Sequence, residues 1–452
     1  MRHARTRLPV SSKVHLMSAR IDHILHRGWD DFRDFVNPLI VLRTELSGEP
    51  TRFVKTNNGK LVDNVGNVVE DLHGTQAFGH RHPAITKAVL EVLESDSPNW
   101  FPSRVSPYAG ALARRLCDRT KMAYQRAFFA SSGSEAVESA MKLARAVTRK
   151  PKILSIERAY HGCTFGSCAL MSPGVFRDPF APHLPGVEAI PINDLDALDK
   201  AVSQADVAAI VVEPIQLEGG VRTLSPEYID ALCALSEKHG ALLVADEVQT
   251  GLGRTGQFLA SDTWPRRPDA VLLAKHLGGG LLPISAMLTR KDLWERAYGA
   301  DFETSEAHNC TFSGSALVCV AALAALDLIT DDVVDRVRRD GDAFRALLRD
   351  KLAELPGFVD VRGAGFVVGI ELSPAKNPWL NFEHFGMEQL SHHPTTGLLL
   401  CHRLYKRGYF CFVCGHDWST LRLQPRFDIP WETLEAFAEA TREELARLAE
   451  LD

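Results

Sequence analysis

Two residues of complementary chemistry follow apolar runs in the chain. Lys275 comes after the run 270–274 and shortly before three glycines, and Asp246 ends the run that starts at Ala241. A lysine at the end of a buried strand can form a Schiff base, which is the usual attachment of pyridoxal phosphate. An acid and a lysine on successive strand ends can hold opposite parts of one pyridine ring. The two residues together therefore indicate a pyridoxal phosphate site.

A phosphate group would need its own binding site, and the Ser-Gly-Ser segment 132–134 offers one. It directly precedes a stretch, 137–144, with apolar residues at helical spacing. The first backbone N–H groups of a helix have no intrahelical acceptor, so a Gly-Ser pair there can bind a phosphate. The alternative is an ordinary serine cap with Glu135 in the first turn. The segment alone leaves both interpretations open.

The elements that must position these residues alternate between helix and strand from about residue 83 onward. This alternation predicts an α/β fold with a mostly parallel sheet flanked by helices. The helical patterns cover 85–93, 111–116 and 228–238, and the strand-like runs cover 208–215 and 241–248.

Other segments have a different character. Residues 38–70 alternate short apolar runs with Asn, Gly and Asp, which predicts antiparallel strands with tight turns. Residues 315–329 are apolar on nearly every side and predict a buried helix. Beyond them, amphipathic helices and strands predict a smaller α+β domain, with helices over 331–355 and 431–448 and strands over 359–372 and 409–413.

These patterns divide the chain into three parts. Residues 1–82 form an N-terminal arm and a small antiparallel segment that joins the small domain. Residues 83–332 form the large, cofactor-binding domain, and 333–452 form the small C-terminal domain.

The composition narrows the class of partner. The chain has 452 residues, is 45% hydrophobic, and carries 51 basic and 57 acidic side chains with a net charge of -6. Such a chain can bury a large core, but it has no basic face for nucleic acid and no polybasic membrane anchor. No apolar run of about 18 residues is present, so no membrane span is expected. Small organic molecules are therefore the expected partners.

The cysteines and the N-terminus bear on the compartment. Nine cysteines without an even disulfide framework favour a reducing cytoplasm. The first 21 residues are basic, with no acid until Asp22. This composition is shared by transit peptides and by disordered or packing arms, and we expect an arm rather than targeting to an organelle.

Three further motifs are set aside. A cluster of Cys401, His402, Cys411, Cys414 and His416 could suggest zinc, but 409–414 has the pattern of a strand whose side chains would point apart, so no metal is expected. The G-x-G-x-x-G at 251–256 matches a dinucleotide fingerprint but is followed by prolines rather than a helical pattern. The glycosylation sequence 309–311 has no meaning without a secretory signal.

Read in order, the motifs resemble those of class III aminotransferases, pyridoxal-phosphate enzymes of fold type I. The resemblance extends over about 38–425, most of the chain. It rests on Gly-His-Arg-His-Pro at 79–83, Ser-Gly-Ser-Glu-Ala at 132–136, Tyr-His-Gly at 160–162, Glu-Pro-Ile-Gln at 213–216, Asp-Glu-Val-Gln-Thr-Gly at 246–251, Gly-Arg-Thr-Gly at 253–256, Lys-His-Leu-Gly-Gly-Gly at 275–280 and Thr-Phe-Ser-Gly at 311–314.

The resemblance implies roles for the cofactor residues. Lys275 is expected to form the Schiff base and to transfer the proton, and Asp246 to pair with the pyridine nitrogen. Gly133 and Ser134 are expected to hold the phosphate. Thr311 resembles a phosphate contact that is donated by the second subunit, so the site would be complete only in a homodimer.

The resemblance also implies what surrounds the pyridine ring. Tyr160 is expected to stack on one face and Val248 to pack on the other. Gln249 is expected to bind the ring hydroxyl, and Glu213 is also expected among the cofactor contacts. Tyr160 alone could equally be a core residue.

The substrate end of the site depends on a charged pair. Arg422 resembles the family arginine that binds a substrate carboxylate with its planar fork. Glu218 resembles the acid that pairs with this arginine in ornithine-type members. The pair would mask the arginine for an ω-amine donor and free it for an α-keto acid. A purely structural ion pair is the alternative.

The chain departs from the family pattern around this pair. Cys163 stands where ornithine and acetylornithine members carry an arginine, which weakens assignment to those two substrates. Leu217 and Arg426 replace a usual glycine and proline. Trp100 and Phe101 fall where the family lines its substrate pocket, and a bulky or partly apolar amine would fit, although both could be core residues.

The sequence therefore predicts a homodimeric aminotransferase. It would move an amino group from an amino acid or ω-amine to a keto acid, with 2-oxoglutarate as the expected acceptor. One alternative is an aminomutase, racemase or decarboxylase on the same scaffold, because Asp246 and Lys275 are common to all of them. Another is a non-catalytic binding protein that has kept the fold, against which the intact lysine, aspartate and phosphate segment argue.

Overall fold

The largest sheet of the protein has seven strands and carries the two motifs around Asp246 and Lys275. The computed structural model describes residues 10–46, 52–74, 76–204, 206–377, 379–384 and 386–451. Only β12 runs antiparallel to its neighbours, so the sheet is mostly parallel, as expected. The strand order is β4 (Arg126–Ala130), β12 (Ser285–Thr289), β11 (Ala270–Leu273), β10 (Leu242–Asp246), β7 (Val207–Val212), β5 (Lys152–Ile156) and β6 (Val187–Ile190).

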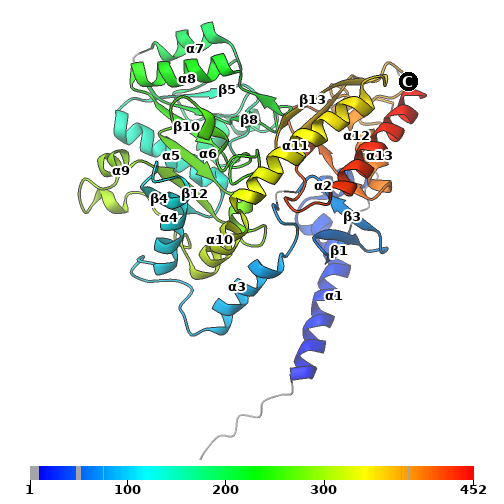
Figure 1. Ribbon diagram of the computed structural model, residues 1–452, viewed down its shortest axis with the longest axis horizontal. Helices are drawn as coiled ribbons and strands as arrows, with labels where there is room; N and C mark the ends of the chain where they lie inside the picture. Colours follow the sequence, from blue (N-terminus) through cyan, green and yellow to red (C-terminus); the bar gives the residue numbers. More distant parts are fainter. Residues whose placement is uncertain are drawn as a thin grey trace, which may run out of the picture.

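Helices cover both faces of this sheet, which explains why its central strands are apolar throughout. Successive side chains of a strand point to opposite faces. Accordingly, Val244 of β10 packs in one cluster with α5 (Gly133–Thr148), whereas Leu243 packs in another with α8 (Pro226–His239). Figure 1 shows these helices and α7 (Leu195–Val202) around the sheet. The fold is the predicted α/β architecture.

A smaller sheet joins the two ends of the chain. Strands β1 (Phe53–Asn57), β2 (Lys60–Asp63) and β3 (Val68–Asp71) are antiparallel neighbours, and β3 pairs in parallel with β15 (Tyr409–Phe410). The predicted strands of this region therefore begin at Phe53.

Residues 38–46, which we expected to be extended, form helix α2 (Pro38–Leu46) instead. The side chain of Asn37 accepts the backbone N–H groups of Leu39 and Ile40 at 3.0 and 3.2 Å. Asparagine before the first turn and proline at the first helical position are a strong helix start. This local capping outweighs the strand-like pattern.

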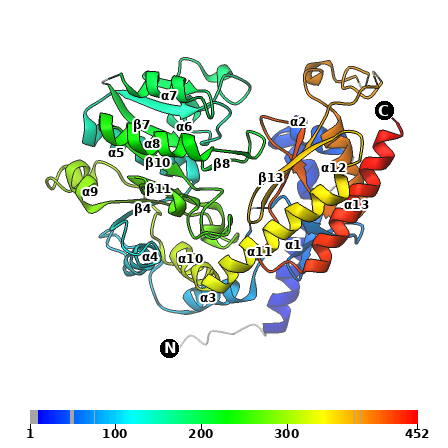
Figure 2. The same cartoon turned by 45° about the horizontal axis from the view of Figure 1, so that its top comes forward.

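The C-terminal third combines a second antiparallel sheet with long helices. The sheet order is β13 (Phe358–Ala364), β14 (Val367–Leu372), β17 (Thr420–Leu423) and β16 (Phe412–Val413). Figure 2 shows α11 (Asp331–Leu352), α12 (Thr396–Lys406) and α13 (Trp431–Ala449) on one side of the molecule. The buried helix predicted at 315–329 is confirmed as α10 (Ala316–Leu328).

The remaining helices frame these sheets. They are α3 (Pro83–Glu94), α4 (Pro107–Arg119), α6 (Phe165–Ala169) and α9 (Lys291–Ala297), and the short strands β8 (Ile215–Gln216) and β9 (Arg222–Thr223) form a hairpin. The domain limits predicted at 82/83 and 332/333 lie at the starts of α3 and α11 and stay a prediction.

Helix α1 (Val10–Phe35) projects from the rest of the molecule in Figure 1. Residues 10–21 of the basic N-terminal segment are thus helical, and residues 1–9 lie outside the described residues. Within the described ranges, no helix combines the length and the apolar character that crossing a bilayer requires.

Candidate active site

A cavity of about 260 Å³ opens at the carboxyl ends of β7, β10 and β11. This is the edge where open α/β sheets place their ligands. The structure brings eight of the expected site residues together around the cavity: Gly133, Ser134, Tyr160, Glu213, Asp246, Val248, Gln249 and Lys275.

The start of α5 forms one end of the cavity. The side chain of Ser132 accepts the N–H of Glu135 at 3.3 Å, while the N–H groups of Gly133 and Ser134 have no acceptor within the helix. The serine cap is therefore present, and it leaves N–H groups at the helix start that could bind an anion, so the two interpretations are compatible. A Cβ on Gly133 would lie 3.1 Å from a methyl of Val248, so glycine lets the two segments approach closely without a shift of that side chain.

The segment after β5 packs against this helix start. Gly162 has a positive φ of 111°, and a Cβ there would lie 1.9 Å from the Ser134 hydroxyl oxygen. The backbone N–H of Cys163 donates to the same hydroxyl at 3.2 Å. Glycine in the Tyr-His-Gly motif is thus a steric requirement of the site.

Lys275 lies just beyond β11, in a left-handed backbone conformation with φ of 47°. Burial lowers the pKa of its amine, and the nearby Arg422 lowers it further, whereas Glu218, Asp246 and Glu213 oppose the shift. The amine is therefore biased toward its neutral, nucleophilic form. Its neighbour His276 donates from Nε2 to the carbonyl of Gly251 at 2.9 Å, which anchors the turn.

Asp246 is held by a histidine that sequence reasoning did not single out. Nδ1 of His161 lies 2.7 Å from one carboxylate oxygen of Asp246, and the N–H of Val248 donates to the other at 3.1 Å. The His161 side chain is fully buried, and its Nε2 has no hydrogen-bond partner within the described residues. The signal was present, because His161 is the middle residue of the Tyr-His-Gly motif.

Glu213 lies in the same buried environment. Burial raises the pKa of its carboxyl well above its usual range, and the neighbouring Asp246 adds to the shift. One carboxyl oxygen accepts the backbone N–H of Tyr160 at 3.1 Å. Burial therefore favours the protonated form of Glu213, which can also act as a hydrogen-bond donor.

The expected substrate pair lies beside the cavity. Arg422 on β17 forms an ion pair with Glu218, and the same guanidinium nitrogen donates to Oε1 of Gln249 at 3.3 Å. Burial alone would raise the pKa of Glu218, but Arg422 and the N–H of Gly415 at 2.9 Å lower it. In this structure Glu218 therefore neutralises Arg422, which is the state expected to leave no free cation for a substrate carboxylate.

Three expected residues lie elsewhere in this single chain. Trp100 and Thr311 are exposed, and the indole N–H of Trp100 donates to the carbonyl of Thr311 at 3.0 Å. Phe101 packs 6.2 Å from the ring of Tyr108. None of the three lines the cavity. Their roles in substrate binding and across a subunit interface stay predictions.

The structure shows the surroundings of the three residues that depart from the family pattern. Cys163 is exposed, with its sulfur 3.3 Å from the hydroxyl of Tyr160. Arg426 makes ion pairs with Glu70 at 3.0 Å and Asp428 at 2.7 Å, so its contacts hold the small sheet to the segment after β17. Leu217 is fully buried.

The motifs set aside form no rival site. The segment 251–256 is a turn that is followed by a bend and a short 3-10 helix (Ala260–Thr263). Within it, Arg254 is buried, donates to the carbonyl of Pro425 and stacks on Phe427. Cys401 and Cys411 have their sulfurs 3.9 Å apart in the core, whereas Cys414 belongs to a different apolar cluster. Among the described residues, no group of three or more potential ligands could hold a metal.

The residues around the cavity fit pyridoxal phosphate. Nε2 of Gln249 is a buried donor with no partner within the described part of the chain, as a contact to a ring hydroxyl requires. The start of α5 provides donors for a phosphate, and Asp246 provides an anion for a pyridinium nitrogen. Tyr160 and Val248 line the same cavity and could lie on either side of a ring.

Comparisons with known proteins agree with this geometry. A family model described as aminotransferase class III matches residues 46–444. The putrescine aminotransferase of Pectobacterium atrosepticum is 36% identical over 358 residues, which cover 75% of each chain. The aminotransferase PigE of a Serratia species is 34% identical over 347 residues, covering 76% of this chain but 41% of PigE. This chain thus corresponds to less than half of PigE.

A solved structure supports the same relationship. The ornithine aminotransferase of Toxoplasma gondii superposes with a TM-score of 0.78 at 27% identity, covering 89% of this chain and 92% of that one.

Proposed function

The chain belongs to the class III aminotransferase family, and on that premise we propose that it transfers the terminal amino group of a diamine or other ω-amine to a keto acid, with 2-oxoglutarate as acceptor. It is an enzyme, and pyridoxal phosphate is its cofactor. The observation that carries the finer proposal is the ion pair between Glu218 and Arg422 beside the cavity.

The chain's own residues account for how the cofactor would be held. Gly133 and Ser134 would bind the phosphate, and Gln249 would bind the ring hydroxyl. Asp246, oriented by His161, would keep the pyridine nitrogen protonated. When bound, pyridoxal phosphate serves as the sink for the electron pair left when the donor loses its α-proton.

Lys275 would move that proton. A lysine amine must be neutral to accept a proton, and burial together with Arg422 favours the neutral state. Burial raises the pKa of the Glu213 carboxyl, which disfavours a second negative charge next to Asp246.

The state of Arg422 favours a donor without an α-carboxylate. While Glu218 neutralises Arg422, the site offers no free cation to a carboxylate there. An amine donor therefore suits this state, and a keto acid would bind once Glu218 has moved away. The names of the relatives are consistent with the proposal, because one acts on putrescine and another on ornithine.

We further propose a homodimer in which Thr311 reaches the cavity of the second subunit. Its exposure and its distance from its own cavity support this arrangement. A cytoplasmic location is also proposed, since the nine cysteines form no disulfide.

The test is a visible-absorbance titration of the purified, cofactor-loaded protein with single amines and no keto acid. Diamines and ω-amines should bleach the yellow colour, and 2-oxoglutarate should restore it. A matched panel of α-amino acids without a terminal amine should act more weakly. Substrate that is isomerised or decarboxylated without bleaching would instead assign the enzyme to another reaction of this scaffold.

A further inference from the structure

Arg422 has a second anchor that none of the family motifs contains. Its Nη2 lies 3.1 Å from Nε2 of His73, whereas its Nη1 faces Glu218 and Gln249. The two anchors come from different parts of the chain: His73 follows β3, and Glu218 follows β8. The guanidinium is thus held from two sides by two different groups.

The chemistry of the pair fixes the tautomer of the imidazole. Arginine only donates hydrogen bonds, so Nε2 of His73 must accept, and the ring proton must be on Nδ1. Nδ1 is buried and has no partner within the described residues. Burial, together with the nearby Arg422, lowers the pKa of His73 to about 4, so the ring stays neutral.

The position of the His73 ring is also constrained. The ring makes edge contacts with Phe410 and Phe412, each at 5.9 Å between centroids. The backbone N–H of His73 donates to the carboxylate of Asp71 at 3.0 Å. His73 therefore presents a fixed, uncharged acceptor to the arginine.

We propose that His73 is a positioning residue that keeps Arg422 in place when Glu218 moves away to admit a keto acid. A carboxylate competes with Glu218 for Nη1, because both are anions. The substrate carboxylate does not compete in this way with His73 at Nη2, because the imidazole is neutral. The arginine then stays in place for the carboxylate and does not follow Glu218. This inference rests on the proposed exchange between amine donor and keto acid.

The role predicts an effect on one half of the reaction. During the donor half, Glu218 holds Arg422 whether or not His73 is present. During the acceptor half, His73 is the remaining side-chain anchor besides Gln249. Loss of His73 should therefore weaken the use of keto acids more than the use of acceptors that lack a carboxylate.

The experiment loads the holoenzyme with an amino group from a diamine, removes the excess and follows the return of yellow absorbance. The acceptors are 2-oxoglutarate and butanal, an aldehyde without a carboxylate. In His73→Leu, the half-saturating concentration of 2-oxoglutarate should rise roughly tenfold relative to that of butanal, the loss expected for a hydrogen bond to a charged group. His73→Gln, whose Oε1 can take the place of Nε2, should recover most of the difference.

His80→Leu is the matched control, because His80 also binds Asp71, at 2.9 Å, but on its other carboxylate oxygen. It should leave the ratio between the two acceptors unchanged. Equal losses with both acceptors in His73→Leu, or a glutamine variant no better than leucine, would reduce His73 to a packing residue and overturn the inference. If 2-oxoglutarate fails to restore the wild type, the proposed function itself fails, which is a separate and recognisable result.

Discussion

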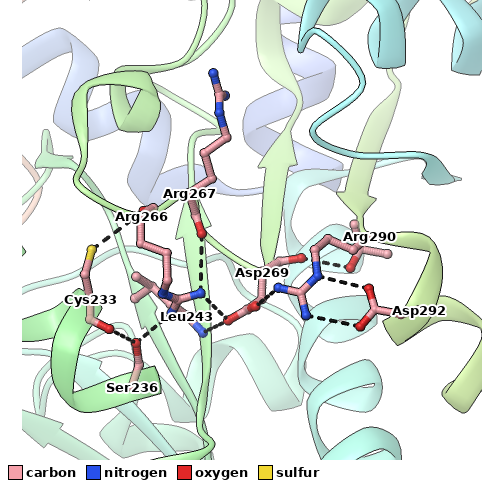
Figure 3. A network of polar contacts seen from close by, with 9 residues as sticks. Cys233, Ser236, Leu243, Arg266, Arg267, Asp269, Arg290 and Asp292 are labelled. Carbon is pink, nitrogen blue, oxygen red and sulfur yellow. Dashed lines mark hydrogen bonds and ion pairs between the residues drawn. The ribbon is translucent and has the colours of Figure 1, made fainter. Parts of the chain in front are cut away.

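Two buried aspartates lie at opposite edges of the main sheet, Asp246 where the strands end and Asp269 where they begin. They differ in the number of charged partners that each carboxylate has. Asp246 ends β10 and contacts His161 and the N–H of Val248. Asp269 directly precedes β11, where it accepts the N–H of Leu243 at 2.8 Å and binds two arginines. Figure 3 shows this second network, in which Arg266 and Arg290 reach the two carboxylate oxygens of Asp269.

The edge around Asp269 has the larger of the two cavities, but the cations that line it have hydrogen-bond partners. Its cavity is about 500 Å³ and is lined by several cations. Lys150 donates to the carbonyl of His239 at 2.7 Å and Arg296 to that of Val147 at 2.9 Å, so both satisfy the ends of helices. At the Asp246 edge, buried nitrogens of His161 and Gln249 have no partner within the described residues, and at the Asp269 edge the same holds for Nε of Arg266. The carboxylates differ more clearly, because Asp269 binds two arginines and Asp246 binds none.

The difference teaches that the ion pairing of the carboxylate, rather than cavity size, distinguishes the two edges of this sheet. Buried polar groups are normally satisfied, so those that are not are the natural contacts of a ligand. Asp269 stabilises the fold, whereas Asp246 is available for chemistry.

The largest expected effect comes from Lys275→Ala. It removes the amine that attaches the cofactor and transfers the proton, so turnover should fall by ~10³-fold or more. Steady-state transamination with a diamine and 2-oxoglutarate measures the loss. Lys150→Ala at the opposite edge is the control and should retain turnover; a comparable loss there would erase the distinction between the edges.

Asp269→Asn should act on stability. Removing the charge leaves Arg266 and Arg290 without their shared anion, and because both arginines are partly exposed, the loss should be about 1–2 kcal/mol. Urea unfolding monitored by fluorescence would show a lower midpoint. An unchanged midpoint would mean that the network of Figure 3 is not a structural anchor.

His73 should make stability depend on pH. Its pKa is lowered to about 4 in the folded protein, so between about pH 6.5 and 4 the unfolded chain binds the proton and the folded chain does not. The free energy of unfolding should therefore fall with decreasing pH across this window, by at most about 3 kcal/mol. In His73→Gln, this part of the slope should be absent, as urea titrations at several pH values would reveal. If the free energy of unfolding depended on pH equally in the wild type and in His73→Gln, the imidazole of His73 would be exposed to water rather than buried.

The smallest effect is expected from Arg296→Ala. This exposed arginine donates to a carbonyl at the end of α5, and such contacts are worth less than about 1 kcal/mol. Thermal unfolding should shift only slightly, with turnover unaffected. A large loss of either would show that the cations of this edge do more than terminate helices.

Much of the cavity could be predicted because its residues lie in local motifs at strand ends. Lys275, Asp246 and Gly133 each follow an apolar run or start a helix, so order along the chain implies proximity in a parallel sheet. His161 was overlooked inside a motif, since nothing in its spacing indicates that it faces Asp246.

Other features depend on contacts that spacing does not encode. His73 meets Arg422 because the chain around it bonds to distant segments: β3 pairs with β15, and the carbonyl of Leu72 accepts the N–H of Gln424 just after β17. Helix α2 depends on a single capping residue, Asn37. The predicted place of Thr311 involves a second subunit and lies beyond what one chain can define.

The most direct measurement of the central claim compares Asp246→Asn and Asp269→Asn in the same two assays, turnover and urea unfolding. The account predicts a crossed result. Asp246→Asn should lose turnover by ~10²-fold or more, because an amide cannot hold a pyridine nitrogen protonated, with a smaller change in unfolding. Asp269→Asn should lose stability but keep turnover under conditions where it is folded. Parallel losses in both assays for both variants would contradict the claim that one edge of the sheet reacts while the other stabilises.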